Sequence, residues 1–260
     1  MLVEQWYVAI LEIKRKGKSN MEISKAGIKA HALITVQERN IQSDIQDWNN
    51  SILIVDNIYE AINKIDSDYA KMLSGKEFGL VYPTINNQFE VYIKYGNDLV
   101  NMISTTHHEL THIDDFTIIG EKFGIKNKRE LTENDYIRLW SEFHATYISM
   151  TEILKYNEKY DYPAIKKETT DKLINYYNSC TGKMVKQQDV FDTTVRNYGN
   201  FFAICDYGKT KDNPPPEYIR GFNYFAVYAF LNQHKDIYKF IDDYNTWKVL
   251  VNRTLRIKSK

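Results

Sequence analysis

The heptapeptide from Thr106 to His112, THHELTH, contains the pattern His-Glu-x-x-His. Residues four apart lie on one face of a helix, so His108 and His112 can hold one metal ion through their imidazoles. Glu109 is rotated by about 100° from His108, and its carboxylate can reach a water that the metal activates. Zinc lowers the pKa of such a water towards about 7, and Glu109 can accept its proton as the water attacks a carbonyl. The pattern predicts a helix here and a catalytic zinc site on it.

A catalytic zinc needs a third protein ligand and a position left for water. The candidates are Asp115, Glu142 and His144. Asp115 follows His112 on the same helix, which favours a supporting role beside the metal or a solvated charge at the helix end. His144 points about 200° around its helix from Glu142, so these two cannot easily share one metal.

Glu142 shares its helix face with three small residues, Ala145, Thr146 and Ser149. Small side chains on this face would let the second helix pack closely against the metal helix. A surface carboxylate is the usual fate of a helical glutamate. With His-Glu-x-x-His upstream, we expect Glu142 to be the third ligand.

Other polar side chains are candidates for smaller roles. His144 and Tyr147 could donate to the oxyanion of a tetrahedral intermediate, although Tyr147 also fits a place in the core. His107 has Thr111 four residues later, so it starts no second metal pattern and is expected to be a packed or polar helix residue. His31 and His234 are expected to be structural or exposed.

The periodicity of apolar residues predicts a mostly helical chain with one hairpin. Steps of three and four favour a long amphipathic helix over Ile41–Ala70. Alternation over 78–95, with a turn at Asn86-Asn87, predicts two antiparallel strands. Helices are expected over Leu99–Ile119, capped at Gly96-Asn97-Asp98, and over Glu133–Tyr156, announced by Thr132.

Residues 161–260 are expected to be helical again, with a break at Asn213-Pro214-Pro215-Pro216 and a buried helix over Tyr218–Leu231. The resulting division is an N-terminal helical segment (1–72), a catalytic core (73–160) and a C-terminal helical segment (161–260), which together could form one compact domain.

Charge and composition argue against several partners. The chain of 260 residues carries 34 Lys+Arg and 34 Asp+Glu, so nothing in its balance favours nucleic acid or an anionic membrane. No stretch approaches the ~20 apolar residues of a membrane-spanning helix, and the start lacks the form of a secretory signal, so a cytoplasmic protein is expected. Cys180 and Cys205 are expected to be thiols.

His108-Glu109-Leu110-Thr111-His112, followed by a helix with Trp140, Glu142, Phe143 and Ala145, resembles the zincin metallopeptidases in their gluzincin arrangement. It is also similar in outline to the ImmA/IrrE-type intracellular zinc peptidases of bacteria. The resemblance covers roughly residues 78–155. Thr111 stands where the ImmA-type motif usually has Gly or Ala, and Thr146 where gluzincins often have Asp.

The resemblance implies an α+β fold, with a mostly helical zincin-like core and a small antiparallel sheet whose edge strand binds extended peptide. It implies Zn²⁺ held by His108, His112 and Glu142, with Glu109 as general base. We therefore expect a zinc metallopeptidase acting on a peptide or protein substrate, with Gln88–Lys94 as the edge strand beside the metal. The alternative is a non-catalytic interaction or regulatory protein of the same fold.

Overall fold

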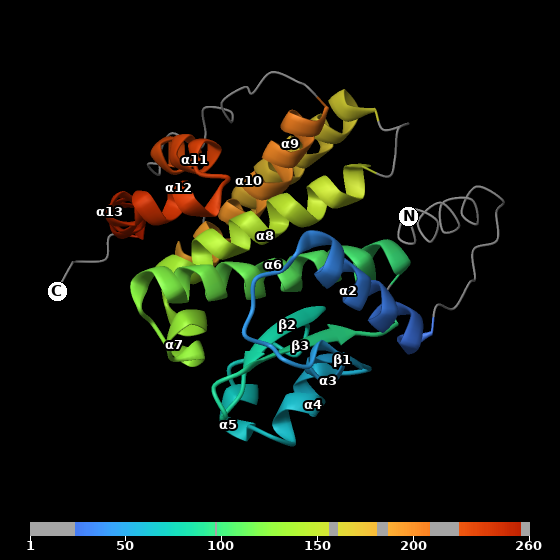
Figure 1. Ribbon diagram of the computed structural model, residues 1–260. Coiled ribbons are helices and arrows are strands. Elements are labelled where there is room, and N and C mark those ends of the chain that lie inside the picture. Colours follow the sequence, from blue (N-terminus) through green and yellow to red (C-terminus); the bar gives the residue numbers. More distant parts are fainter. Residues whose placement is uncertain (1–23, 97, 156–160, 181–186, 209–223, 256–260) are drawn as a thin grey trace. The chain divides into compact units, whose positions relative to one another are not determined.

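The computed structural model describes residues 24–96, 98–155, 161–180, 187–208 and 224–255 (Figure 1). The chain divides into two compact units. The first runs up to Ile118 and includes Asn127–Arg129, and the second comprises Ile119–Lys126 and the chain from Glu130 onwards. Across the described ranges, no helix combines the length and apolar character needed to cross a membrane.

The first unit combines a small mixed sheet with helices. The strand order is β1-β3-β2, with β1 parallel and β2 antiparallel to β3. Its elements are α2 (Lys25–Arg39), α3 (Trp48–Ser51), β1 (Ile52–Val55), α4 (Ile58–Asn63), α5 (Ser67–Ala70), β2 (Gly79–Pro83), β3 (Phe89–Lys94) and the larger part of α6 (Leu99–Phe123).

The single helix expected over Ile41–Ala70 is wrong. The region holds β1 between short helices, because three polar residues cap new helices within it. Asp47, Asn57 and Asp66 each accept a hydrogen bond from the backbone N–H three residues later, which starts a helix at each position. Between the first two caps, Ile52–Val55 is a run of apolar, mostly β-branched residues that suits a strand.

The hairpin is confirmed, but the place of Gln88–Lys94 in the sheet is not as predicted. β3 pairs with β2 on one side and with β1 on the other, so this strand is central and the edges are β1 and β2. The sheet is therefore mixed rather than antiparallel. The alternation of apolar and polar residues in β3 does not reveal that β1, from much earlier in the chain, pairs with it in parallel.

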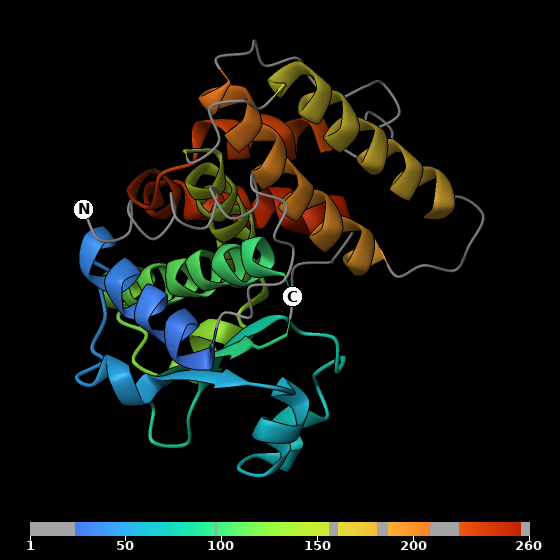
Figure 2. The same ribbon diagram turned by 90° about the vertical axis from the view of Figure 1, so that its right-hand side faces the viewer.

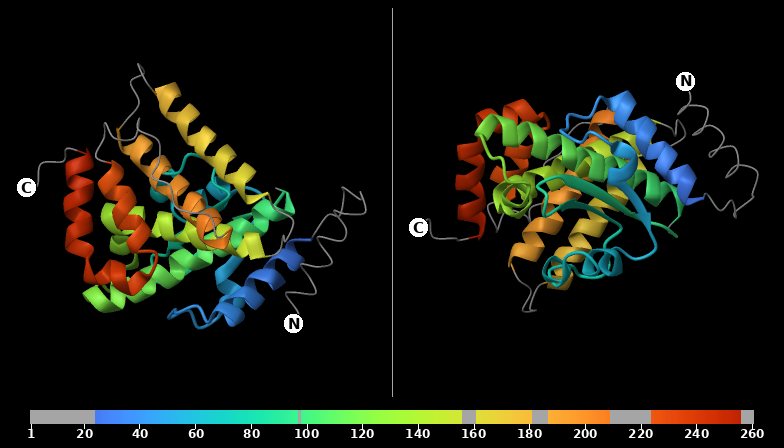
Figure 3. Two further views of the ribbon diagram at one scale, coloured as in Figure 1. Left: turned by 90° about the horizontal axis from the view of Figure 1, so that it is seen from above. Right: turned by 60° about the horizontal axis from the view of Figure 1, so that its bottom comes forward.

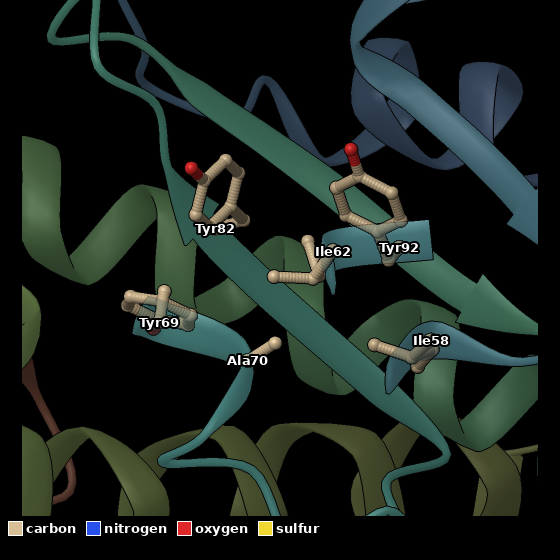
Figure 4. Packing of buried hydrophobic residues seen from close by; sticks show 6 residues of the cluster. All are labelled: Ile58, Ile62, Tyr69, Ala70, Tyr82 and Tyr92. Carbon is tan, nitrogen blue, oxygen red and sulfur yellow. The ribbon is translucent and has the colours of Figure 1, made fainter. Parts of the chain in front are cut away.

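The two faces of the sheet are covered by different helices. On one face Tyr82 and Tyr92 pack with residues of α4 and α5 in a cluster (Figure 4) completed by Ile58, Ile62, Tyr69 and Ala70. On the other face Phe89 lies 5.9 Å from Phe116 of α6, measured between ring centroids. The helix carrying His-Glu-x-x-His thus lies along one face of the sheet, opposite α4 and α5 (Figure 1).

The start of α6 is as predicted, whereas its end comes later. Asp98 accepts hydrogen bonds from the N–H groups of Val100 and Asn101. Gly120 does not end the helix. A Cβ there would lie 2.9 Å from Leu131 Cδ1, so the missing side chain lets Leu131 approach. Gly124, at φ +69°, adopts the left-handed conformation that follows many helices.

The regular elements of the second unit are all helices among the described residues. Its helices α9 and α10 lie side by side (Figures 2 and 3). Besides the end of α6, its elements are α7 (Lys128–Glu133, whose first two residues belong to the first unit), α8 (Asp135–Lys155), α9 (Tyr162–Cys180), α10 (Gln187–Tyr207), α11 (Tyr224–Gln233), α12 (Ile237–Asp242) and α13 (Tyr244–Leu255).

The helix expected over Glu133–Tyr156 is observed as α8, with a different cap. Asn134, rather than Thr132, accepts hydrogen bonds from the N–H groups of Tyr136 and Ile137. Within Tyr218–Leu231, Tyr224–Leu231 forms most of α11, whereas 218–223 and the break at 213–216 lie outside the described residues.

Candidate metal centre

The two histidines of the pattern face each other on α6. Their Nε2 atoms lie 3.1 Å apart, and their rings meet edge to face with 4.6 Å between centroids. His112 also stacks on Phe116, one further turn along the helix, with 5.6 Å between centroids. Because His112 is held between His108 and Phe116, its ring orientation is defined by packing before any ion binds.

The spacing of these two nitrogens fits a tetrahedral zinc. With Zn–N bonds of about 2.0–2.1 Å, two ligand nitrogens of a tetrahedral site lie about 3.3 Å apart. The observed separation of 3.1 Å differs from this by little. Two imidazoles and a carboxylate also form a donor set that zinc commonly uses.

Among the described residues, the group of three His, Cys, Asp or Glu side chains that could hold a metal ion is His108, His112 and Glu142. The ligand atoms that they offer all lie within 4.8 Å of one another. The sequence predicted this set. Asp115 and His144, the competing candidates for third ligand, are not members of the group.

Glu142 carries an ion pair within its own unit. Arg196 Nε of α10 lies 2.9 Å from Glu142 Oε2, and the side chains are 53% and 15% exposed respectively. α10 approaches α8 closely here because residue 199 is glycine: a Cβ at Gly199 would lie 2.6 Å from the Phe143 carbonyl oxygen and 2.9 Å from Thr146 Cβ. Thr146 thus lies where α10 contacts α8.

Glu109 is buried, and the space for its carboxylate depends on a glycine in β2. A Cβ at Gly79 would lie 2.6 Å from Glu109 Cγ and 2.5 Å from Thr105 Cγ2, and would also collide with Glu109 Oε1. Sequence reasoning missed Gly79, because only the folded sheet brings the start of β2 against α6.

Arg39, at the end of α2, contacts α6 next to the candidate ligands. Its Nη2 donates to Thr111 Oγ1 at 2.9 Å, and its Nη1 donates to the His107 carbonyl oxygen at 3.1 Å. Thr111, the position at which the chain departs from the ImmA-type motif, therefore serves as a contact for α2. Arg39 is a second residue that sequence reasoning missed.

The other candidate site residues, Asp115, His144 and Tyr147, are buried or hydrogen-bonded to a neighbouring helix. Asp115 is fully buried on α6. His144 is buried and stacks on Trp140, with 4.8 Å between centroids. The Tyr147 hydroxyl donates to Asp206 Oδ2 at 2.9 Å, so in this structure it is engaged with α10.

Two further histidines of the first unit pack together in its interior. His107 is buried, and its ring meets that of His31 edge to face, with 5.5 Å between centroids. Burial lowers the pKa of His31 to about 4, because desolvation penalises the charged imidazolium. Both residues are packed, as expected for His107 and for a structural His31.

His234 and Cys205 lie in the second unit and are also buried. The ring nitrogens of His234 lie 2.7 Å from the Phe230 carbonyl oxygen and 2.8 Å from Asp243 Oδ2, which is a structural environment. The side chain of Cys180 lies outside the described residues.

Comparison with models of known protein families, with curated proteins and with solved structures gives no match.

Proposed function

We propose that this protein is a zinc-dependent metallopeptidase, with His108, His112 and Glu142 as zinc ligands and Glu109 as general base. The observation that carries the proposal is the grouping of the three ligand atoms within 4.8 Å. The donor set and the 3.1 Å between the imidazole nitrogens suit zinc. When bound, zinc lowers the pKa of a water and polarises the scissile carbonyl.

Glu109 is suited to move the proton in this reaction. Glu109 follows His108 in sequence, and its side chain packs against Gly79, which restricts its rotamers. As general base it accepts a proton from the attacking water, and it then delivers that proton to the leaving amine. Burial also limits competing hydrogen bonds from bulk water.

The edge strand that would receive a peptide is β2 rather than β3. Lys94 N–H donates to the Phe78 carbonyl oxygen and Thr84 N–H to the Gln88 carbonyl oxygen, so the even-numbered residues of β2 bond to β3. By alternation, the N–H and C=O groups of Gly79 and Val81 point to the open edge. An extended substrate paired there would pass next to Glu109, which contacts Gly79.

The test is the Glu109→Gln variant, assayed for zinc content and for cleavage of a peptide library followed by mass spectrometry. Gln is nearly isosteric but cannot accept the proton. We therefore expect zinc to be retained and hydrolysis to fall by about 100- to 10,000-fold. Glu121→Gln, at an exposed position on the same helix, is the matched control and should cleave normally.

Two outcomes would contradict the proposal. Equal cleavage by wild type and Glu109→Gln would remove Glu109 from the role of base. A zinc-loaded wild type that cleaves no peptide would favour the non-catalytic alternative.

A further inference from the structure

Arg196 of α10 pairs with Glu142 of α8, the candidate carboxylate ligand. Its Nε is 2.9 Å from Glu142 Oε2, whereas its side chain is more than half exposed. Glu142 itself is mostly buried. A cation beside a mostly buried carboxylate compensates part of its lost hydration and restricts its side-chain conformation.

The neighbouring arginine on α8 is engaged differently. Arg138 lies 3.1 Å from Asp135 and 3.2 Å from Asp192, and Gln188 also donates to Asp192. Arg138 therefore ties α8 to α10 through Asp192, and Glu142 also contributes to its electrostatic surroundings. Both arginines join α8 to α10, Arg138 through Asp192 and Arg196 through its ion pair with Glu142.

The backbone supports the Arg196–Glu142 pair. Gly199 is three residues after Arg196 on α10, and the absence of a Cβ there lets α10 lie against the Phe143 carbonyl oxygen and Thr146. Residues three apart share a helix face, so this close approach of the helices falls next to the ion pair. Arg196 contacts Glu142 through Nε, the inner nitrogen of its guanidinium.

We infer that Arg196 is a positioning residue of the metal site, acting through Glu142. By pairing with the carboxylate it restricts the Glu142 side chain to the place where it lies within 4.8 Å of the two histidine ligand atoms. This inference rests on the proposed function, because it assumes that Glu142 is a zinc ligand.

The experiment is a chelator-competition measurement of zinc affinity for wild type, Arg196→Gln, Glu142→Ala and the double variant. Loss of a group that orients a ligand typically weakens metal affinity by about 10- to 100-fold, and we expect that loss in Arg196→Gln. In the Glu142→Ala background the same substitution should have no further effect, since Arg196 acts through Glu142. Arg196→Lys keeps the positive charge but lacks the planar guanidinium, so its zinc affinity should lie between those of Arg196→Gln and wild type.

Arg138→Gln is the matched control for a structural effect on the helix pair. It should lower the thermal midpoint and weaken zinc binding less than Arg196→Gln does, because Arg138 pairs with Asp135 and Asp192 and Glu142 is a further carboxylate in its surroundings. The inference is overturned if Arg196→Gln binds zinc as tightly as wild type, if its effect persists undiminished without Glu142, or if Arg138→Gln weakens zinc equally.

Failure of the proposed function gives a different pattern. If wild type binds zinc, with the expected dependence on Arg196, but hydrolyses no peptide, the inference stands and catalysis is refuted. If wild type binds no zinc, both are refuted.

Discussion

Replacing Gly79 by alanine tests the close approach of β2 to Glu109. The added Cβ would lie 2.5 Å from Thr105 Cγ2 and 2.6 Å from Glu109 Cγ, whereas carbon atoms pack best at about 3.5–4.0 Å. Both contacts would be about 1 Å too short. Overpacking of this kind costs about 1–3 kcal/mol.

A second effect opposes this steric cost, so the direction in which the melting temperature changes tells which of the two is larger. Alanine in a strand is ordinarily more favourable than glycine by about 0.5–1 kcal/mol. Since Thr105 is β-branched and stiff in its helix, we expect steric cost to exceed this gain, leaving a net loss of roughly 0.5–2 kcal/mol. For a chain of this size each kcal/mol lowers the melting temperature by about 2–4 °C.

The assay is thermal unfolding of Gly79→Ala, in excess zinc and in chelator. The control places the same substitution in a Thr105→Ser, Glu109→Ala background, which removes the colliding atoms. There Gly79→Ala should become neutral or stabilising. A higher melting temperature for Gly79→Ala in the otherwise unchanged protein would refute the packing of β2 against Glu109.

Three further predictions concern other residues. His31 has a pKa lowered to about 4 by burial, so the unfolded state binds more protons between about pH 6.5 and 4 and stability falls as the pH falls. In urea unfolding with chelator, this residue should lower the free energy of unfolding by about 2 kcal/mol at pH 5 relative to pH 7. His31→Phe should remove that difference, and an unchanged pH dependence of the unfolding free energy in this variant would contradict the prediction. Arg39→Ala loses the contacts to Thr111 and to the His107 carbonyl. In denaturant unfolding it should lower the free energy of unfolding by about 1–3 kcal/mol, and an unchanged value would show that α2 does not stabilise α6. Glu142→Ala should weaken zinc affinity by at least about 10-fold. His144→Ala should leave zinc bound, because the ring of His144 stacks on Trp140. If calorimetric titration shows the larger loss of affinity in His144→Ala, the roles of the two residues are exchanged.

The pairing of His108 with His112 could be predicted because its signal is local. His108 and His112 are one helical turn apart, and helix geometry alone places them on one face. Glu142 was selected over His144 by its position on the second helix, and the structure groups it with the two histidines. The hairpin and the cap at Asp98 could also be predicted from the sequence, since alternation and capping depend on residues close in sequence.

Most of the errors and omissions concern contacts between distant segments. β1 lies in a region whose apolar spacing also suits a helix, and its pairing with β3 depends on a strand much later in the chain. The caps at Asp47, Asn57 and Asp66 were signals in the sequence that could have divided the expected helix. No local pattern announces that Gly79 contacts Glu109 or that Arg196 pairs with Glu142.

The most direct test of the central claim is the metal content of the native protein, purified without chelators, beside that of its His112→Ala variant. With two imidazoles and a carboxylate within 4.8 Å, we predict about one zinc per chain in the native protein, because this donor set suits zinc. His112→Ala should retain little or none. A native protein that carries no zinc and binds none more tightly than micromolar, or a variant that keeps the full amount, would contradict the assignment of this site.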